Sequence, residues 1–130
     1  QRTYTIQAAN ELLPWLTEIF KQLEEPREFL IVSEKRLVEL DYVVRNNGQS
    51  DVDKQIRQCE DTVLQLRGRI NELATEVAEK KIEIRDLRTG LVDFPGVREN
   101  RRIWLCWRVG EPEVGYWHEL DAGFSSRQAI

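Results

Sequence analysis

The stretch VDKQIRQCEDTVLQLRGRINELATEV, residues 52–77, decides the fold of this 130-residue chain. Apolar residues recur through it in strict heptad steps, at Val52, Ile56, Cys59, Val63, Leu66, Ile70, Leu73 and Val77. Most of the other positions are polar or charged, which is the pattern of a helix with one narrow coiled-coil seam. The sequence therefore predicts a long helix over about 51–80, capped by Ser50 or Asp51.

A second long helix is expected before it, over about 13–45, preceded by a short helix at 6–12 that Thr5 caps. Its seam residues follow alternating three- and four-residue steps and are Leu16, Ile19, Leu23, Leu30, Leu37, Leu40 and Val44. Residues 46–50, Asn-Asn-Gly-Gln-Ser, are a loop signal between the two long helices. Because a short loop makes consecutive helices antiparallel neighbours, we expect a helical hairpin.

The first long helix carries apolar residues well outside its seam. They are Leu13, Trp15, Phe20, Phe29, Ile31, Val32, Val38 and Val43. A helix that is apolar over so wide an arc needs more than one neighbour, either the C-terminal segment or a second chain. Centred on Phe20, Phe29 and Ile31, this arc predicts a homodimer formed through the first long helix.

After residue 80 the apolar period changes from helical to strand-like. Residues 81–85 alternate with period two, and short apolar segments follow at 91–95, 102–107 and 114–118. The tail from residue 121 is expected to be an ordered loop or turn. The predicted fold class is α+β: a long antiparallel, coiled-coil-like hairpin packed with a small, mainly antiparallel C-terminal β-sheet. We expect one domain over 1–130, with the hairpin at 5–80 and the β module at 81–130.

Composition excludes several classes of function. The chain is 32% charged with a net charge of −4, and its longest apolar run, residues 103–107, has only five residues, so no membrane span is expected. The acidic balance gives nucleic acid no general attraction, and the short basic run of Arg98, Arg101 and Arg102 is interrupted by Glu99. We therefore do not expect a nucleic-acid partner, and a cytoplasmic location is the default.

The residues that can carry chemistry gather in the last 40, where the only histidine, His118, and one of two cysteines, Cys106, are found. A metal site would need both on one face of the sheet. If Arg108 pairs with Glu113 across a four-residue turn, Trp104 faces Trp117 and the two ligands lie on opposite faces. A bulge or one-residue slip would bring them together. No HExxH or paired CxxC spacing supports a metal, so none is assigned and the cofactor stays unknown.

The sequence gives only weak support to other kinds of chemistry at the same residues. A Cys106 nucleophile activated by His118 meets the same objection of strand parity, whereas His118 alone could act as an acid–base group. Cys59 and Cys106 could pair in principle, but isolated cysteines on apolar faces are more often small buried hydrophobes. Trp104, Trp107 and Trp117 could form an aromatic binding surface or simply pack the sheet. No glycine motif for nucleotide phosphates is present.

Several segments resemble an uncharacterised prokaryotic family, domain of unknown function 2203. The opening segments are Thr3-Tyr4-Thr5-Ile6 and Leu12-Leu13-Pro14. The closing segments are Thr89-Gly90-Leu91-Val92-Asp93-Phe94-Pro95, Leu105-Cys106-Trp107-Arg108, Gly110-Glu111-Pro112-Glu113 and Tyr116-Trp117-His118, then Gly123-Phe124 with Arg127-Gln128. The resemblance implies no assigned activity and supplies no catalytic residue. Polar and aromatic residues within the closing segments become the candidate binding cluster: Asp93, Arg108, Glu111, Trp117, His118 and Arg127.

Two hypotheses follow. The first is a non-enzymatic protein-interaction module that self-associates through its first long helix. The alternative is a metal- or small-molecule-dependent enzyme with its site at the C-terminal polar and aromatic cluster around His118. Whether the chain is an enzyme is left open, as is the identity of any small molecule.

Overall fold

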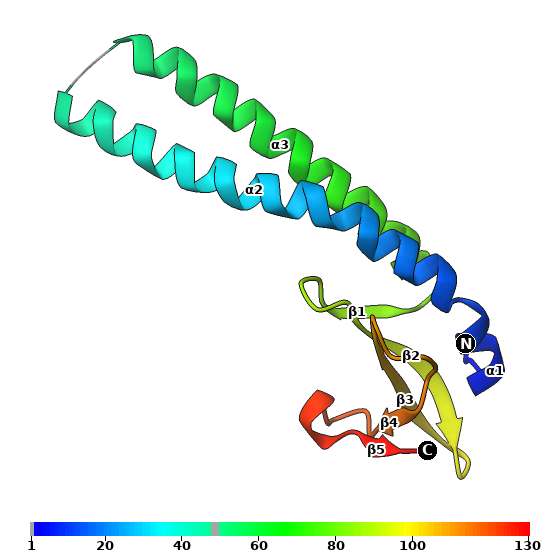
Figure 1. Ribbon diagram of the computed structural model, residues 1–130. Helices are drawn as coiled ribbons and strands as arrows, with labels where there is room; N and C mark the ends of the chain where they lie inside the picture. Colours follow the sequence, from blue (N-terminus) through cyan, green and yellow to red (C-terminus); the bar gives the residue numbers. More distant parts are fainter. Residues whose placement is uncertain (1, 48–49) are drawn as a thin grey trace. The chain divides into compact units, whose positions relative to one another are not determined.

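The computed structural model describes residues 2–47 and 50–130. Three helices come first in the chain: α1 (Ile6–Glu11), α2 (Leu13–Asn47) and α3 (Ser50–Glu79), as Figure 1 shows. The helices predicted over 6–12, 13–45 and 51–80 are thus confirmed to within a turn at each end. Gly48 and Gln49 of the predicted loop lie outside the described residues.

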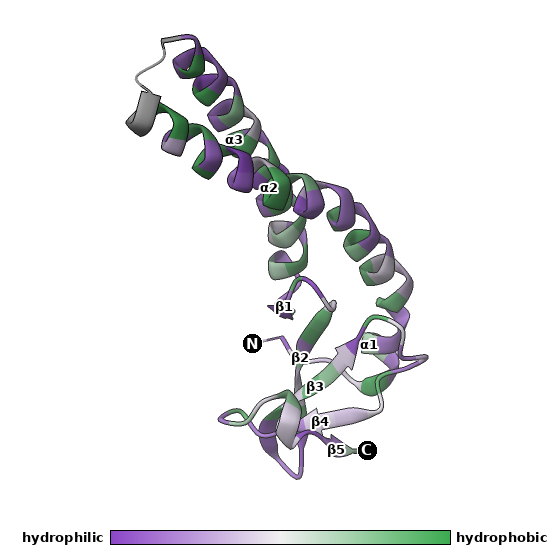
Figure 2. Cartoon of the chain, turned by 60° about the vertical axis from the view of Figure 1, so that its left-hand side comes forward, coloured by the Kyte–Doolittle hydropathy of each residue, from purple (hydrophilic) through white to green (hydrophobic). Residues whose placement is uncertain are grey.

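The described chain forms two compact units, and the first is the helical hairpin of residues 22–73. Here α2 and α3 run side by side in opposite directions, with apolar and polar faces that Figure 2 distinguishes along each helix. The seam residues of both helices are buried or half-buried, with Leu23 and Leu73 almost fully covered. Cys59 adds a polar contact between the helices, because its thiol donates to the Ser33 carbonyl at 3.2 Å.

The second unit joins residues 1–21 to residues 74–130. The N-terminal arm belongs here because Tyr4 attaches it to the sheet. The Tyr4 N–H donates to the Pro95 carbonyl and its hydroxyl to the Lys80 carbonyl, both at 2.7 Å. Its ring packs edge-on against Phe94 at 5.3 Å between centroids. Thr5 then caps α1, since its hydroxyl accepts from the Ala8 N–H at 3.0 Å.

The sheet of this unit has five antiparallel strands in sequence order: β1 (Glu83–Asp86), β2 (Leu91–Arg98), β3 (Arg101–Arg108), β4 (Tyr116–His118) and β5 (Gln128–Ala129). The pairing of β1 with β2 shifts register between Ile84 and Asp86. The tail contains a 3₁₀ turn (Phe124–Ser126) before β5. The tail thus adds an edge strand that the sequence did not indicate.

One face of the sheet carries the apolar core of this unit. Val92, Phe94, Ile103, Leu105, Trp107 and Trp117 expose 5% or less of their surface. Phe20, which the sequence placed in the unsatisfied arc of the first long helix, is also buried, and its ring lies beside Gly90. The C-terminal segment therefore covers this part of the arc, and Phe20 does not belong to any exposed face.

The architecture is α+β, as the periodicity predicted: two long helices packed together and a C-terminal antiparallel sheet. Within the described residues, no helix combines the length and the apolar character needed to cross a bilayer. The opposite face of the sheet carries Asp93, Cys106 and His118, and with them the candidate site.

Candidate functional site

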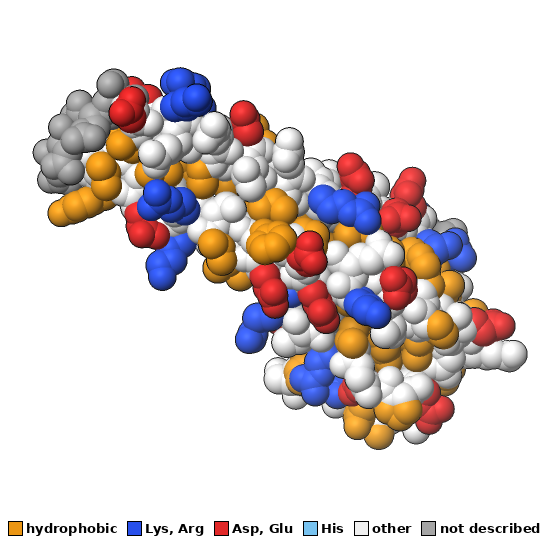
Figure 3. Space-filling view, turned by 45° about the horizontal axis from the view of Figure 1, so that its top comes forward, with side chains coloured by type: hydrophobic (Ala, Val, Ile, Leu, Met, Phe, Trp, Pro, Cys, Tyr) orange, Lys and Arg blue, Asp and Glu red, His pale blue; other side chains and the backbone are white. Residues whose placement is uncertain are grey.

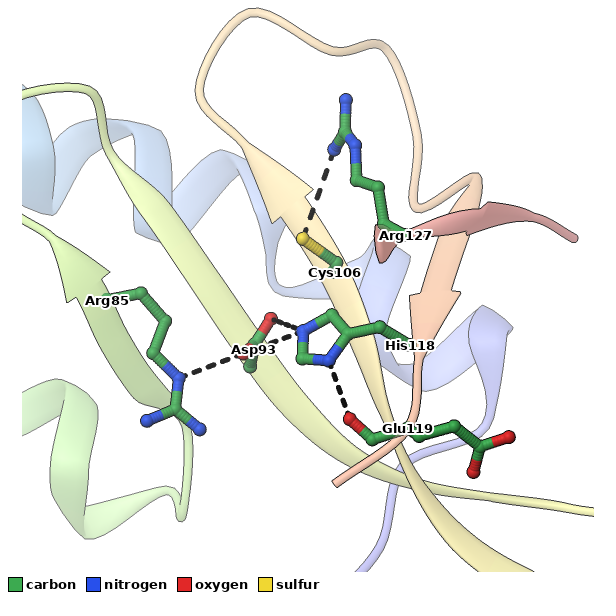
Figure 4. A network of polar contacts seen from close by, with 6 residues as sticks. All are labelled: Arg85, Asp93, Cys106, His118, Glu119 and Arg127. Atoms are coloured by element: carbon green, nitrogen blue, oxygen red, sulfur yellow. Dashed lines mark hydrogen bonds and ion pairs between the residues drawn. The ribbon is translucent and has the colours of Figure 1, made fainter. Parts of the chain in front are cut away.

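The strand register places Asp93, Cys106 and His118 on one face of the sheet. Asp93 of β2 lies directly opposite Cys106 of β3, and His118 of β4 lies opposite Trp104, two residues before Cys106. Because side chains alternate along a strand, all three point to the same side. Figure 4 shows the Asp93 carboxylate and the Cys106 thiol near the His118 ring.

This register corrects the sequence-based one. Trp104 faces His118 rather than Trp117, and Leu105 faces Trp117, so the predicted separation of Cys106 from His118 was wrong. The predicted four-residue turn does not form, because β3 ends at Arg108 and β4 begins only at Tyr116. The connection between β3 and β4 is held near its C-terminal end by Asn10 of α1, whose side-chain oxygen accepts from the Val114 N–H at 2.7 Å. A slip of one residue exchanges the faces of a strand.

Asp93 is the centre of the cluster, with 2% of its surface exposed. The Arg85 Nε–H donates to its Oδ2 atom at 2.9 Å, and His118 Nε2 lies 3.0 Å from both carboxylate oxygens. The Arg85 guanidinium also lies 4.9 Å from the centroid of the Trp104 ring. A buried carboxylate needs such partners, because an unpaired buried charge is strongly destabilising.

The hydrogen bonds of His118 define which ring nitrogen carries hydrogen. Nδ1 lies 2.9 Å from the Glu119 carbonyl oxygen, which can only accept, so Nδ1 is the donor. In a neutral imidazole the lone pair of Nε2 would then face the two Asp93 oxygens. Lone pairs repel, so a positive centre has to lie between them, either a proton or a metal cation. Glu119, which supplies this carbonyl, is itself held by an ion pair between its side chain and Arg101.

Cys106 is the third member and is fully buried. Burial raises the pKa of its thiol to about 11, and the negative charge of Asp93 acts in the same direction. Arg127 opposes this shift, with Nη1 3.9 Å from the sulfur atom. Cys106 and Cys59 are both free thiols, so the disulfide that the sequence left open is absent between them.

Arg127 and Glu111 form a second ion pair beside the cluster. The two guanidinium N–H groups of Arg127 donate to the two Glu111 oxygens at 3.1 and 2.6 Å, and both side chains are largely covered. Burial alone would raise the pKa of Glu111, but the hydrogen bonds from Arg127 and the Arg108 N–H lower it below its usual range. The Arg127 guanidinium also stacks between aromatic rings, 3.9 Å from the Tyr116 centroid and 4.2 Å from that of Phe124.

The candidate binding residues do not all meet. Asp93 and His118 are in direct contact, and Glu111 and Arg127 adjoin them through Cys106. Arg108 is peripheral, since its guanidinium lies over Phe124. Trp117 lies on the core face of the sheet, on the side opposite to that of His118.

The basic run considered for nucleic acid is largely engaged in other contacts. Arg101 pairs with the carboxylates of Glu119 and Glu99. The Arg98 guanidinium lies 4.6 Å from the centroid of the Trp117 ring. Paired in this way, Arg101 has less charge to offer to a phosphate backbone than an unpaired arginine would have.

Sequence reasoning missed two residues of the cluster. Cys106 was weighed as a ligand and set aside on strand parity, and only the observed register restores it. Arg85 received no role, although its place in the alternating segment 81–85 put it on a defined side of the first strand. Its partner Asp93 is eight residues away along the chain, beyond the turn of residues 86–90.

Helical hairpin and small sheet together define the class: an α+β protein whose sheet carries a buried histidine–aspartate–cysteine cluster beside an arginine–glutamate pair. The chain belongs to the family described as "Uncharacterized conserved protein (DUF2203)", whose match covers residues 2–130. The resemblance seen in the sequence is thereby confirmed over nearly the whole chain. No curated protein and no solved structure matches the chain significantly.

Proposed function

We propose that this protein is a non-enzymatic interaction module that associates with a second copy of itself through α2. One observation carries the proposal: large apolar side chains remain exposed on α2 within the hairpin unit. Phe29, Ile31, Val32 and Val38 expose 54–71% of their surface. Figure 3 shows hydrophobic side chains interrupting the charged surface of the hairpin. Two of them, Ile31 and Val38, are seven residues apart and so lie on one side of α2, and exposed apolar groups that cluster are typical of protein interfaces.

The spacing of these residues favours another helix as the partner. Ile31, Val38 and Tyr42 are separated by seven and four residues, so they lie along one stripe of α2, and all three are exposed. Seven- and four-residue steps are the pattern of a coiled-coil seam. Lys35 and Glu39 are exposed beside this stripe and carry opposite charges. An antiparallel second copy can place each charge near its opposite across a two-fold axis, which supports a homodimer.

Sedimentation equilibrium of the chain with Ile31→Glu and Val38→Glu tests this proposal. The wild type is expected to dimerise, and the double variant to dissociate at least about 10-fold more readily, because each buried aliphatic side chain contributes about 1.5–3 kcal/mol. Val97→Glu is the matched control, since Val97 is an exposed apolar residue of β2, outside the hairpin unit. A wild type that stays strictly monomeric at high micromolar concentration contradicts the proposal.

A second candidate function, a metal- or small-molecule-dependent enzyme, is favoured by the convergence of Asp93, Cys106 and His118. His118 and Asp93 each expose 2% of their surface, so a substrate could reach them only if covering side chains moved. Because His118 is the only histidine, its modification by diethylpyrocarbonate reports directly on this access. Modification in the native protein is expected for an enzyme. Complete protection until the chain unfolds would exclude this candidate.

A further inference from the structure

We propose that Asp93, Cys106 and His118 form a binding site for one Zn²⁺ ion, with Cys106 Sγ, His118 Nε2 and an Asp93 oxygen as the protein ligands. The inference rests on the cluster of the second candidate function, but it requires neither catalysis nor self-association.

Distances within the cluster suit a single ion. The three potential ligand atoms all lie within 4.8 Å of one another. Zinc bonds of about 2.0–2.3 Å place the ligands of a tetrahedral site roughly 3.3–3.8 Å apart. The side chains therefore need to shift by about 1 Å or less to close around an ion. The strands that carry them are adjacent, so no strand has to move for this closure.

The hydrogen bonds around the cluster leave Nε2 of His118 and Oδ1 of Asp93 directed toward one another and available to an ion. Nδ1 of His118 is held by the Glu119 carbonyl, which leaves Nε2 for the ion. Metal-binding histidines commonly donate their other ring N–H to a backbone carbonyl in this way. Arg85 engages the Oδ2 atom of Asp93, and Oδ1 faces His118 without that contact. The ion would replace the positive centre that the geometry requires between the imidazole and the carboxylate.

The charge balance also favours a divalent ion. Carboxylate and thiolate together supply two negative charges, which Zn²⁺ neutralises. Binding releases the Cys106 thiol proton to solvent, together with any proton held between His118 and Asp93. Arg127 lies close to the sulfur atom, but the bidentate pair with Glu111 compensates its charge. A soft thiolate with an imidazole selects zinc over magnesium or calcium, which prefer oxygen ligands.

Three protein ligands would leave the fourth tetrahedral position to water or to another small ligand, as in zinc sites that stay open. Burial of all three residues keeps that position away from bulk solvent. The Arg127 and Arg85 guanidinium groups contact the cluster from either side, as Figure 4 shows. Because Asp93 and Cys106 already neutralise Zn²⁺ and Glu111 compensates Arg127, the Arg85 guanidinium is the charge that an anionic fourth ligand would balance.

Cobalt titration of the chelator-treated 130-residue chain tests the site, because Co²⁺ replaces zinc and is visible by absorption. We expect one Co²⁺ per chain and a thiolate-to-cobalt charge-transfer band in the near ultraviolet. Cys106→Ser should lose this band and bind at least 10-fold more weakly, while Cys59→Ser, the matched control at the other cysteine, should behave as the wild type. Zinc should displace the cobalt from the wild type.

Circular dichroism shows whether each variant is folded, and thermal melting shows whether zinc stabilises it. Together they distinguish the loss of a metal site from a folding defect. Zinc should raise the melting temperature of wild type and Cys59→Ser, but not that of a folded Cys106→Ser variant. Absence of cobalt binding by the wild type at millimolar concentration would overturn the site. So would unchanged binding in Cys106→Ser, or a loss confined to Cys59→Ser. Sedimentation of the same samples reports self-association separately, so failure of one proposal is distinguishable from failure of the other.

Discussion

Replacing Glu111 by glutamine isolates the electrostatic contribution of its pair with Arg127. The wild-type carboxylate accepts from both guanidinium N–H groups and, at 2.8 Å, from the Arg108 N–H. Glutamine keeps one oxygen and has an NH₂ group in place of the other. In the variant this NH₂ group faces the Arg127 N–H that, in the wild type, donates to a Glu111 oxygen at 2.6 Å. One charge-assisted hydrogen bond is lost and a donor faces a donor in its place.

The expected loss is about 2 kcal/mol in the free energy of unfolding at pH 7, because hydrogen bonds to charged groups contribute roughly 1.5–3 kcal/mol. The side chains of Arg127 and Glu111 are only 13% and 18% exposed, so solvent screens the pair little. Urea unfolding followed by tryptophan fluorescence measures this loss. All four tryptophans, at 15, 104, 107 and 117, belong to the unit that contains Glu111, so their signal reports on that unit.

Acid should remove the difference between wild type and Glu111→Gln. The pKa of Glu111 is lowered in the folded state, so its contribution is complete above its usual value of 4.5 and is lost as the pH falls through the lower folded value. The two proteins should therefore differ constantly from about pH 6 to 8, and the difference should shrink progressively as the pH falls below 4.5. Glu113→Gln, at an exposed glutamate two residues away, is the control and should change stability by less than about 0.5 kcal/mol. A Glu111→Gln variant as stable as this control at pH 7 would refute the reasoning.

Three further substitutions or modifications test the fold. Gly90→Ala should cost about 2–4 kcal/mol in urea unfolding, because Gly90 has a φ of +71° and a Cβ there would lie 2.3 Å from a Val109 methyl group; a cost below about 1 kcal/mol would contradict this. Tyr4→Phe should cost about 1 kcal/mol, since the hydroxyl donates to a backbone carbonyl at 2.7 Å. In native alkylation followed by mass spectrometry, Cys59 should react well before the fully buried Cys106, whose thiol pKa is raised to about 11; equal rates would show that the sheet opens readily.

Local patterns predicted the helices well because each depends on residues close in sequence. The heptad seam from Val52 to Val77 requires only a periodic apolar stripe and a partner, and its residues are buried or half-buried as expected. Thr5 caps α1 as predicted, since the capping bond spans three residues. Element types and limits in the helical part were therefore readable from the sequence.

Residues 1–21 show what local sequence patterns cannot predict. Helical periodicity assigned residues 5–21 to the hairpin region, but in the structure they form one compact unit with the sheet. The contacts responsible join distant positions, such as Tyr4 with Pro95 and Asn10 with Val114. Phe20 was assigned to the self-association arc for the same reason, because the segment that covers it lies far along the chain.

By itself, the sequence determined the α+β class, the three helices, the main strands and the stretch in which polar motif residues gather. The tertiary structure alone decided which of those residues meet. A strand exposes its two faces alternately, so the connection of residues 109–115 fixed whether Cys106 faces His118 or points away from it. Helical periodicity tolerates an error of one residue in a boundary, whereas strand pairing does not. For this reason the hairpin was predictable from residues 52–77, and the histidine–aspartate–cysteine cluster became visible only in the folded sheet.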